Sequence, residues 1–310
     1  MKRILVTGAN GLLGQKLVYR MKWMNNVQCI ATAKGENRLL DHAGYEYYDG
    51  DITDHSRMRE IIIQSKPDVI IHGAAMTNVD ACETETEVCK MINVAAVENL
   101  ANICDEKNIH LVHVSTDFIM DGKNGPYDEN AEPNPLSYYG WSKLEAEKIV
   151  QKMKSPWAIL RTVLVYGIVD NMSRSNIVLW VKGSLEKKQT INVVNDQWRT
   201  PTLAEDLAEG CLLAAIKEAT GIYNISGNEL MSIYEIACKV ADHYGFDKSL
   251  INPIDSSTLN QSAKRPPRTG FIIDKAKREL GYEPSSFEES LNILDKQIGS
   301  YGRRKTEDEK

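Results

Sequence analysis

The chain has 310 residues, 42% hydrophobic and 26% charged, a composition typical of soluble globular proteins that allows one large domain with a smaller second lobe. Its 37 basic and 43 acidic side chains give a net charge of −6, which excludes a strongly basic duplex-binding surface, so no nucleic-acid partner is expected. The six cysteines are scattered without zinc-type spacing and no apolar run is long enough to cross a bilayer, so we expect a cytoplasmic protein with no metal site and no membrane partner.

A strand, a glycine turn and a helix follow one another at the start of the chain. Residues 4–7 are β-branched or apolar, glycines come next at positions 8, 11 and 14, and a helical pattern runs to about residue 24. Glycine lets a pyrophosphate approach the backbone, and the free N–H groups of the new helix face the anion. A plain tight turn would also use glycine, but this placement favours a dinucleotide site at Gly8, Gly11 and Gly14.

The second predicted strand, at residues 27–33, is followed by two cations. A carboxylate at this point would bind the adenosine ribose hydroxyls of NAD, whereas a cation favours the 2′-phosphate of NADP. Lys34 and Arg38 occur here, and no acid precedes Glu36. We therefore expect NADP as the cofactor, with NAD as the alternative if both cations are only solvated loop charges.

Strands and helices alternate through the first part of the chain. Further strands are predicted at residues 45–48, 68–72 and 111–114, and a long helix at 84–106. This alternation predicts a Rossmann-like, doubly wound α/β fold with a parallel sheet. Ligands of such sheets lie at the carboxyl ends of the strands. The residues that follow the strands should therefore line the site, namely Gly8, Lys34, Asp51, Ala74 and Ser115.

The alternation loosens after a sixth strand at residues 158–162. We expect an NAD(P)-binding domain at 1–168, to which part of 190–226 returns, and a smaller, mainly substrate-binding lobe at 169–300. Later helices are predicted near residues 176–185, 203–215, 232–244, 274–280 and 287–298. The charged tail at 302–310 has the composition of a disordered segment.

A tyrosine and a lysine share one face of the helix predicted at residues 138–153. Tyr139 and Lys143 are four positions apart, so their side chains project to the same side. A phenol, with a pKa of about 10, exchanges protons poorly at neutral pH until a nearby ammonium stabilises the phenolate. With the hydroxyl of Thr116, the pair suits carbonyl reduction by a nicotinamide cofactor, in which Tyr139 donates the proton. A surface pair has the same spacing, and it is the preceding dinucleotide fold that favours catalysis.

Several motifs together resemble a known family. They are residues 7–14 (TGANGLLG), Ser115-Thr116-Asp117, Tyr139-x-x-x-Lys143, and Arg161-Thr162 leading to Val165-Tyr166-Gly167. These motifs resemble the extended short-chain dehydrogenases/reductases. Segments 76–80, 115–122, 133–143 and 196–202, with Arg265-Pro266, resemble the dTDP-4-dehydrorhamnose reductase group within that family. The resemblance covers the chain to about residue 298.

The resemblance implies an NAD(P)H-dependent oxidoreductase of nucleotide-sugar metabolism that reduces a 4-keto-6-deoxy nucleotide sugar. It implies that Tyr139 donates the proton, that Lys143 lowers the tyrosine pKa and binds the ribose, and that Thr116 tunes the phenol. The further cofactor positions that it implies are Leu12, Leu13, Ile52, Ala75, Met76 and Asn93, of which Asn93 would support the lysine. The implied substrate positions are Thr116, Asp117, Leu164, Trp198, Arg199 and Arg265. Leu164 stands where the family has a substrate-stacking tryptophan, so the sugar and the nucleotide are left open.

Alternatives are open for part of this site and for the activity. Guanidinium forks suit substrate phosphate, but surface ion pairing explains Arg199 and Arg265 equally well. The motifs, with residues 226–238, also resemble the regulatory β subunit of methionine adenosyltransferase, a non-catalytic NADP-binding protein. A 4,6-dehydratase fits less well, because Phe118 stands where those enzymes carry a glutamate. The sequence does not decide between a monomer and a homodimer.

Overall fold

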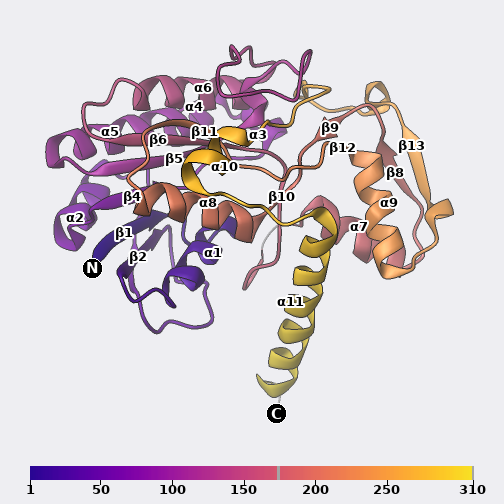
Figure 1. The fold of residues 1–310 in the computed structure, drawn as a ribbon, viewed down its shortest axis with the longest axis horizontal. Coiled ribbons are helices and arrows are strands. Elements are labelled where there is room, and N and C mark those ends of the chain that lie inside the picture. Colours follow the sequence, from indigo (N-terminus) through magenta and orange to yellow (C-terminus); the bar gives the residue numbers. More distant parts are fainter. Residues whose placement is uncertain (173–174, 309–310) are drawn as a thin grey trace.

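The computed structural model describes residues 1–172 and 175–308, and its centre is a seven-stranded parallel sheet (Figure 1). The strand order is β11-β6-β5-β4-β1-β2-β3. The strands are β1 (Lys2–Thr7), β2 (Val27–Ala33), β3 (Glu46–Asp49), β4 (Val69–His72), β5 (His110–Thr116), β6 (Trp157–Thr162) and β11 (Gly221–Asn224). The chain passes from β3 back across β1 to β4, so the point where ligands of such sheets bind lies between β1 and β4. The predicted doubly wound α/β fold is confirmed.

Helices cover both faces of the sheet, and each face has its own apolar core. One core includes side chains of α1 (Leu12–Met21), α8 (Ala204–Ile216) and α10 (Asp274–Leu280). The other includes side chains of α2 (His55–Ser65), α5 (Ala96–Lys107) and α6 (Tyr138–Val150). All four residues of β4 are buried, which accounts for its continuous Val/Ile character.

The long helix predicted at residues 84–106 is confirmed as a continuous helical stretch at 86–107, which contains one π-helical turn that was not predicted. The stretch consists of α4 (Thr86–Lys90), the π-helical turn η1 (Met91–Ala95) and α5, and the short helix α3 (Val79–Thr84) precedes it. Asn93 lies in the π turn, where its carboxamide exchanges hydrogen bonds of 2.8 and 3.0 Å with the backbone of Met76. This bonding to a distant loop accompanies the local widening of the helix, which apolar periodicity does not report.

A separate apolar cluster forms the smaller C-terminal lobe. Its helices are α7 (Ile177–Glu186), α9 (Ile233–Tyr244) and α11 (Phe287–Asp308), and its parallel strands are β8 (Ile191–Val194) and β13 (Ile251–Ile254). Figure 1 shows the lobe beside the main sheet, with β9 (Trp198–Arg199) and β12 (Met231–Ser232) between them. The remaining short elements are β7 (Val165–Tyr166), β10 (Thr202–Leu203), η2 (Asp117–Ile119), η3 (Lys248–Leu250) and η4 (Ser256–Thr258).

Helix α11 projects from the body of the molecule and continues through Asp308 (Figure 1). The expectation of a disordered tail at 302–310 stays a prediction, and residues 309–310 lie outside the described residues. Arg, Lys and Glu in this stretch are good helix formers, and the preceding turns supply the helix nucleus. Among the helices of residues 1–172 and 175–308, none is long and apolar enough to cross a membrane.

Candidate active site

Two adjoining cavities open at the carboxyl edge of the sheet. The first, of about 480 Å³, lies where β1, β2 and β3 end, and we call it the glycine-turn cavity. The second, of about 540 Å³, lies where β5 and β6 end, and we call it the tyrosine cavity. Asn10, Gly11, Gly73 and Ala75 line both, so the two cavities meet at the turn between β1 and α1.

The glycine turn is closely packed because its residues lack side chains. Gly8 has a φ of +71°, and a Cβ there would lie 2.9 Å from the backbone N and Cα of Ala74. A Cβ at Gly14 would lie 2.2 Å from the carbonyl oxygen of Gly8. Gly11 is the N-cap of α1, and because it offers no side-chain cap, the first N–H groups of the helix are left for a ligand.

Both cations predicted after β2 line the glycine-turn cavity. Lys34 is exposed, at 82% for its side chain, and its Nζ lies 2.9 Å from Oδ2 of Asp51. The hydrogen bond from Lys34 is the largest cause that lowers the pKa of Asp51, to about 2. The backbone N–H of Arg38 donates to Oδ1 of Asn10 at 3.0 Å, which ties the Arg38 loop to the glycine turn.

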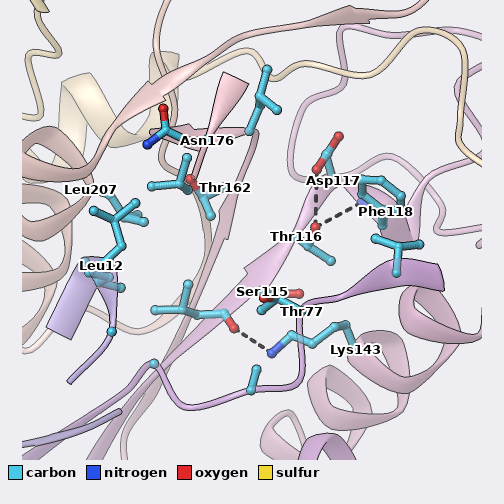
Figure 2. Close-up of a pocket in the computed structure, with 18 of the residues that line it drawn as sticks. Leu12, Thr77, Ser115, Thr116, Asp117, Phe118, Lys143, Thr162, Asn176 and Leu207 are labelled. Atoms are coloured by element: carbon cyan, nitrogen blue, oxygen red, sulfur yellow. Dashed lines mark hydrogen bonds between the residues drawn. The ribbon is translucent and has the colours of Figure 1, made fainter. Parts of the chain in front are cut away.

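The tyrosine cavity brings together Thr116 from β5 and Tyr139 and Lys143 from α6. Ser137 caps α6 by accepting the N–H of Gly140 at 3.2 Å, which fixes the first turn of the helix, where Tyr139 lies. The Thr116 hydroxyl donates to Oδ1 of Asp117 and accepts the N–H of Phe118, both at 3.2 Å (Figure 2). These bonds fix the end of β5 beside the cavity.

Lys143 is enclosed by protein, with 3% of the residue exposed. Its Nζ donates to the carbonyl oxygen of Val114 at 2.7 Å and lies 3.1 Å from Nε2 of His113. Figure 2 shows its side chain reaching toward β5. Burial lowers the pKa of Lys143 to about 8, although the negative charge of Glu147 acts to raise it.

Burial also governs the protonation of Tyr139. It raises the pKa of the phenol, and the hydrogen bond with Thr116 is the largest influence in the opposite direction. The Lys143 ammonium donates to the carbonyl oxygen of Val114 on β5, and burial is the largest influence on the phenol in this structure, so the expected lowering of the tyrosine pKa by Lys143 stays a prediction. Tyr139 is therefore a neutral phenol at physiological pH, the form that a proton donor requires.

Asn93 supports the loop after β4 and reaches Lys143 only indirectly. Besides its bonds with Met76, its amide nitrogen lies 3.0 Å from Oγ of Ser142, the residue before Lys143 in α6. Ser142 in turn donates to the carbonyl oxygen of Tyr139 at 2.7 Å. Sequence reasoning missed Ser142, which links the π turn to the helix that carries the tyrosine and the lysine.

Three predicted substrate residues do not line either cavity. Arg199 is 3% exposed, and its Nε lies 3.6 Å from Oδ2 of the buried Asp117. Arg265 makes two hydrogen bonds with Asp80, of 2.6 and 3.2 Å. The guanidinium carbon of Arg268 lies over the indole of Trp198, 5.8 Å from the centroid of the indole ring. Of the two interpretations of Arg199 and Arg265, carboxylate pairing is the one that the structure contains.

Part of the lining of the tyrosine cavity is apolar. Leu164, with a φ of +39°, lines it together with Val169, Met172 and Leu207. Asn176 also lines it and caps α7, accepting the N–H of Leu179 at 3.2 Å (Figure 2). Sequence reasoning missed Asn176, although an asparagine directly before an apolar helical pattern is a typical N-cap.

Most of the predicted cofactor residues line one of the two cavities. Those of the glycine-turn cavity are Gly8, Gly11, Lys34, Arg38, Asp51, Ile52, Ala74 and Ala75. Those of the tyrosine cavity are Gly11, Leu12, Leu13, Ala75, Ser115, Tyr139 and Lys143, and the predicted substrate residues Thr116, Asp117 and Leu164 lie there too. Gly14, Met76 and Asn93 lie behind this lining and act through close packing or hydrogen bonds.

The sheet order and the cleft at its carboxyl edge define a Rossmann-like α/β protein with a glycine turn at the switch point. The chain belongs to the RmlD substrate binding domain family, whose profile matches residues 1–298.

Comparison with individual proteins gives two groups of relatives. The chain is 30% identical over 298 residues to the probable low-salt glycan biosynthesis reductase Agl14 of Haloferax volcanii, covering 96% of this chain and 98% of that protein. It is 34% identical over 268 residues to the beta subunit of methionine adenosyltransferase 2 of Xenopus laevis, covering 85% of this chain and 78% of that protein. The crystal structure of dTDP-4-dehydrorhamnose reductase from Bacillus anthracis in complex with NADP matches with a TM-score of 0.81 at 28% identity, over 96% of this chain and 100% of that one. Both groups that the motifs resemble are thus confirmed as relatives.

Proposed function

We propose that the protein is an NADPH-dependent reductase of a nucleotide-activated 4-keto-6-deoxy sugar. The observation that supports this most is that Tyr139, Thr116 and Lys143 meet in a cavity that adjoins the glycine turn. The Haloferax relative is named as a reductase, and the Bacillus relative is a dTDP-4-dehydrorhamnose reductase with NADP. Residues and relatives support the same reaction class.

The residues of the cleft fit a dinucleotide cofactor. The tight glycine turn and the uncapped start of α1 would hold the pyrophosphate. Lys34 and Arg38 at the rim of the same cavity would hold the 2′-phosphate of NADP. In the tyrosine cavity, the buried hydroxyl of Ser115 has no hydrogen-bond partner among the described residues, so it is available to a polar group of the nicotinamide end.

The side chains of the tyrosine cavity have distinct tasks in this reaction. Bound NADPH supplies the hydride for the carbonyl carbon. Tyr139, kept neutral by burial, donates its proton to the carbonyl oxygen, and the Thr116 hydroxyl then turns from Asp117 to donate to the phenolate that remains. The ammonium of Lys143 adds positive charge at the same cavity. The apolar wall at Leu164 and Val169 suits the methyl end of a 6-deoxy sugar.

Replacement of Tyr139 by phenylalanine tests this proposal. Purified protein is mixed with NADPH and a panel of 4-keto-6-deoxy nucleotide sugars, and the absorbance of reduced nicotinamide is followed. Tyr139→Phe is expected to lower kcat about a thousandfold while NADPH affinity changes little, because only the proton donated in the transition state is lost. Tyr138→Phe, the neighbouring tyrosine outside the cavity, is the matched control and should keep its turnover. Undiminished turnover in Tyr139→Phe would reject the role of Tyr139.

A second candidate function is that of an NADP-binding regulatory subunit. It is favoured by the 34% identity to the beta subunit of methionine adenosyltransferase 2, which extends over 85% of this chain. The two functions differ in the same assay. If the protein binds NADPH, oxidises it with no sugar of the panel, and changes the KM of a methionine adenosyltransferase catalytic subunit, the regulatory function replaces the reductase.

A further inference from the structure

Behind the tyrosine cavity, three adjacent strands carry a buried row of polar side chains. Thr7 of β1, His72 of β4 and His113 of β5 are register partners, so they project to the same face of the sheet. Each is at most 1% exposed. The Thr7 hydroxyl lies 2.7 Å from Nδ1 of His72, and the two imidazole rings are stacked with centroids 5.3 Å apart.

The row ends at Lys143, whose Nζ lies 3.1 Å from Nε2 of His113. An ammonium has three donors and no acceptor, so Nε2 of His113 accepts this hydrogen bond and the imidazole proton is on Nδ1. Burial keeps the imidazole neutral by lowering the pKa of His113 well below its usual value. With the bond to Val114, two of the three ammonium protons are directed to β5, and one is left for the cavity.

We propose that His113 is a positioning residue of the reductase, which accepts a hydrogen bond from the Lys143 ammonium, fixes its location beside the cavity and favours its charged form. The inference rests on the reductase function proposed above, because that function requires the charge of Lys143. His113 lines neither cavity, so it acts only through the lysine.

The surroundings of Lys143 set the direction of the effect. Ionisable groups that face it are Tyr139 and Glu147 of α6, Cys89 of α4, and His72 and His113 of the sheet. Glu147 favours the ammonium although Arg161 binds its carboxylate at 2.8 Å, whereas burial disfavours the ammonium. A hydrogen bond to the charged form favours that form, so loss of the Nε2 acceptor lowers the pKa of Lys143 further.

His113→Leu removes the acceptor with little change in volume, and His72→Leu is the matched control. His72 is equally buried at the partner position of the next strand, but its hydrogen bond goes to Thr7. In His113→Leu, the pH at which kcat/KM falls on the basic side is expected to move down by about one unit. Turnover at pH 8 then drops severalfold and recovers at pH 6. In His72→Leu this fall of kcat/KM on the basic side, the basic limb of the pH profile, is expected at the same pH as in the wild type.

Two amide variants at the same position separate the hydrogen bond from simple packing. The carbonyl oxygen of a glutamine can reach the place of Nε2, whereas that of an asparagine stops near Nδ1. His113→Gln is therefore expected to restore the wild-type basic limb, and His113→Asn is not. If His113→Leu does not fold, the pH profiles of the Gln and Asn variants still test the hydrogen bond. Equal pH profiles in the Gln and Asn variants would contradict the proposed hydrogen bond.

Titration of the lysine followed by ¹⁵Nζ NMR needs no substrate and separates this inference from the reductase function. The signal of Lys143, identified by its loss in Lys143→Arg, is expected to titrate at lower pH in His113→Leu than in the wild type. An unmoved titration in folded His113→Leu would overturn the inference whatever the turnover. A moved titration in a protein that reduces no sugar of the panel would count against the reductase function and leave the His113–Lys143 link standing.

Discussion

Burial acts on Tyr139 and Lys143 in opposite directions. It raises the pKa of the phenol and lowers the pKa of Lys143 to about 8. The ammonium is present below this pKa and is lost as the pH rises through it. We therefore expect kcat/KM to be level at neutral pH and to fall above pH 8. In Lys143→Arg, whose guanidinium stays charged, the fall should be absent even if the rate is lower, and a wild-type profile that is level to pH 10 would contradict the requirement for the ammonium.

Lys34 is expected to select the phosphorylated cofactor. In Lys34→Glu the ammonium at the rim is replaced by a carboxylate beside Asp51, so a 2′-phosphate meets repulsion, whereas a ribose hydroxyl does not. The Kd for NADPH should rise about tenfold or more while that for NADH changes little. Fluorescence titration with both cofactors measures this. Lys187→Glu, at an exposed lysine of the C-terminal lobe, is the control, and an unchanged NADPH/NADH ratio in Lys34→Glu would reject the role of Lys34.

Residue types and local spacing predict which side chains gather at the cavity better than they predict the partners of those side chains. The four-residue spacing of Tyr139 and Lys143 places both in one cavity. That the ammonium bonds Val114 and His113 depends on how α6 packs on β5, which no local pattern records. Arg265 likewise pairs with Asp80, 185 positions away, so sequence reasoning left its partner open.

At the scale of elements, alternating hydrophobicity predicts the strands and helices of the sheet well. The strand at residues 27–33 and the helix at 274–280 have the predicted limits. Each is one uninterrupted element whose apolar side chains are buried, so the local pattern of residue types is enough to delimit it. The π turn at Met91–Ala95 within the long helix was not predictable in this way, since the bonds of Asn93 to Met76 come from the tertiary fold. Thr116 belongs to β5 itself, two residues beyond the predicted end of the strand.

Asp170 ties the loop that carries Arg38 to the segment after β7. Its Oδ2 accepts the N–H of Leu40 at 3.0 Å and the hydroxyl of Tyr19, and Gln15 holds its backbone N–H at 2.9 Å. In Asp170→Asn these bonds lose their charge, so the Arg38 loop should loosen. We expect faster hydrogen exchange at Leu40 and NADPH binding about threefold weaker or more. Tyr19→Phe, which leaves the bond to Leu40, should have the smaller effect, and equal exchange at Leu40 in Asp170→Asn would contradict the link.

At the scale of the whole molecule, two carboxylates near the tyrosine cavity, those of Asp117 and Asp80, join the large domain to the segment that follows β13. Asp117, next to Thr116, accepts the hydroxyl of Thr269 at 2.5 Å and faces Arg199. Asp80 of α3 binds Arg265 and accepts the N–H of Ala263 at 3.0 Å. Val79, next to Asp80, lines the tyrosine cavity, so we expect the position of this segment to affect the shape of the site.

Replacement of Asp80 by alanine tests this coupling. Asp80 is partly exposed, so the loss should change the free energy of unfolding by at most about 1 kcal/mol, a shift in Tm of less than about 3 °C. Hydrogen exchange at Ala263 should nevertheless become much faster, and KM for the sugar should rise more than kcat falls.

The Arg265 side chain lowers the pKa of Asp80, so in the wild type the link is present above the ordinary carboxyl pKa of about 4 and is lost as pH falls through the folded value below it. Asp242→Ala removes an exposed ion pair with Lys248 inside the lobe and is the control. If both variants change exchange at Ala263 and KM equally, the link through Asp80 has no special part in shaping the site.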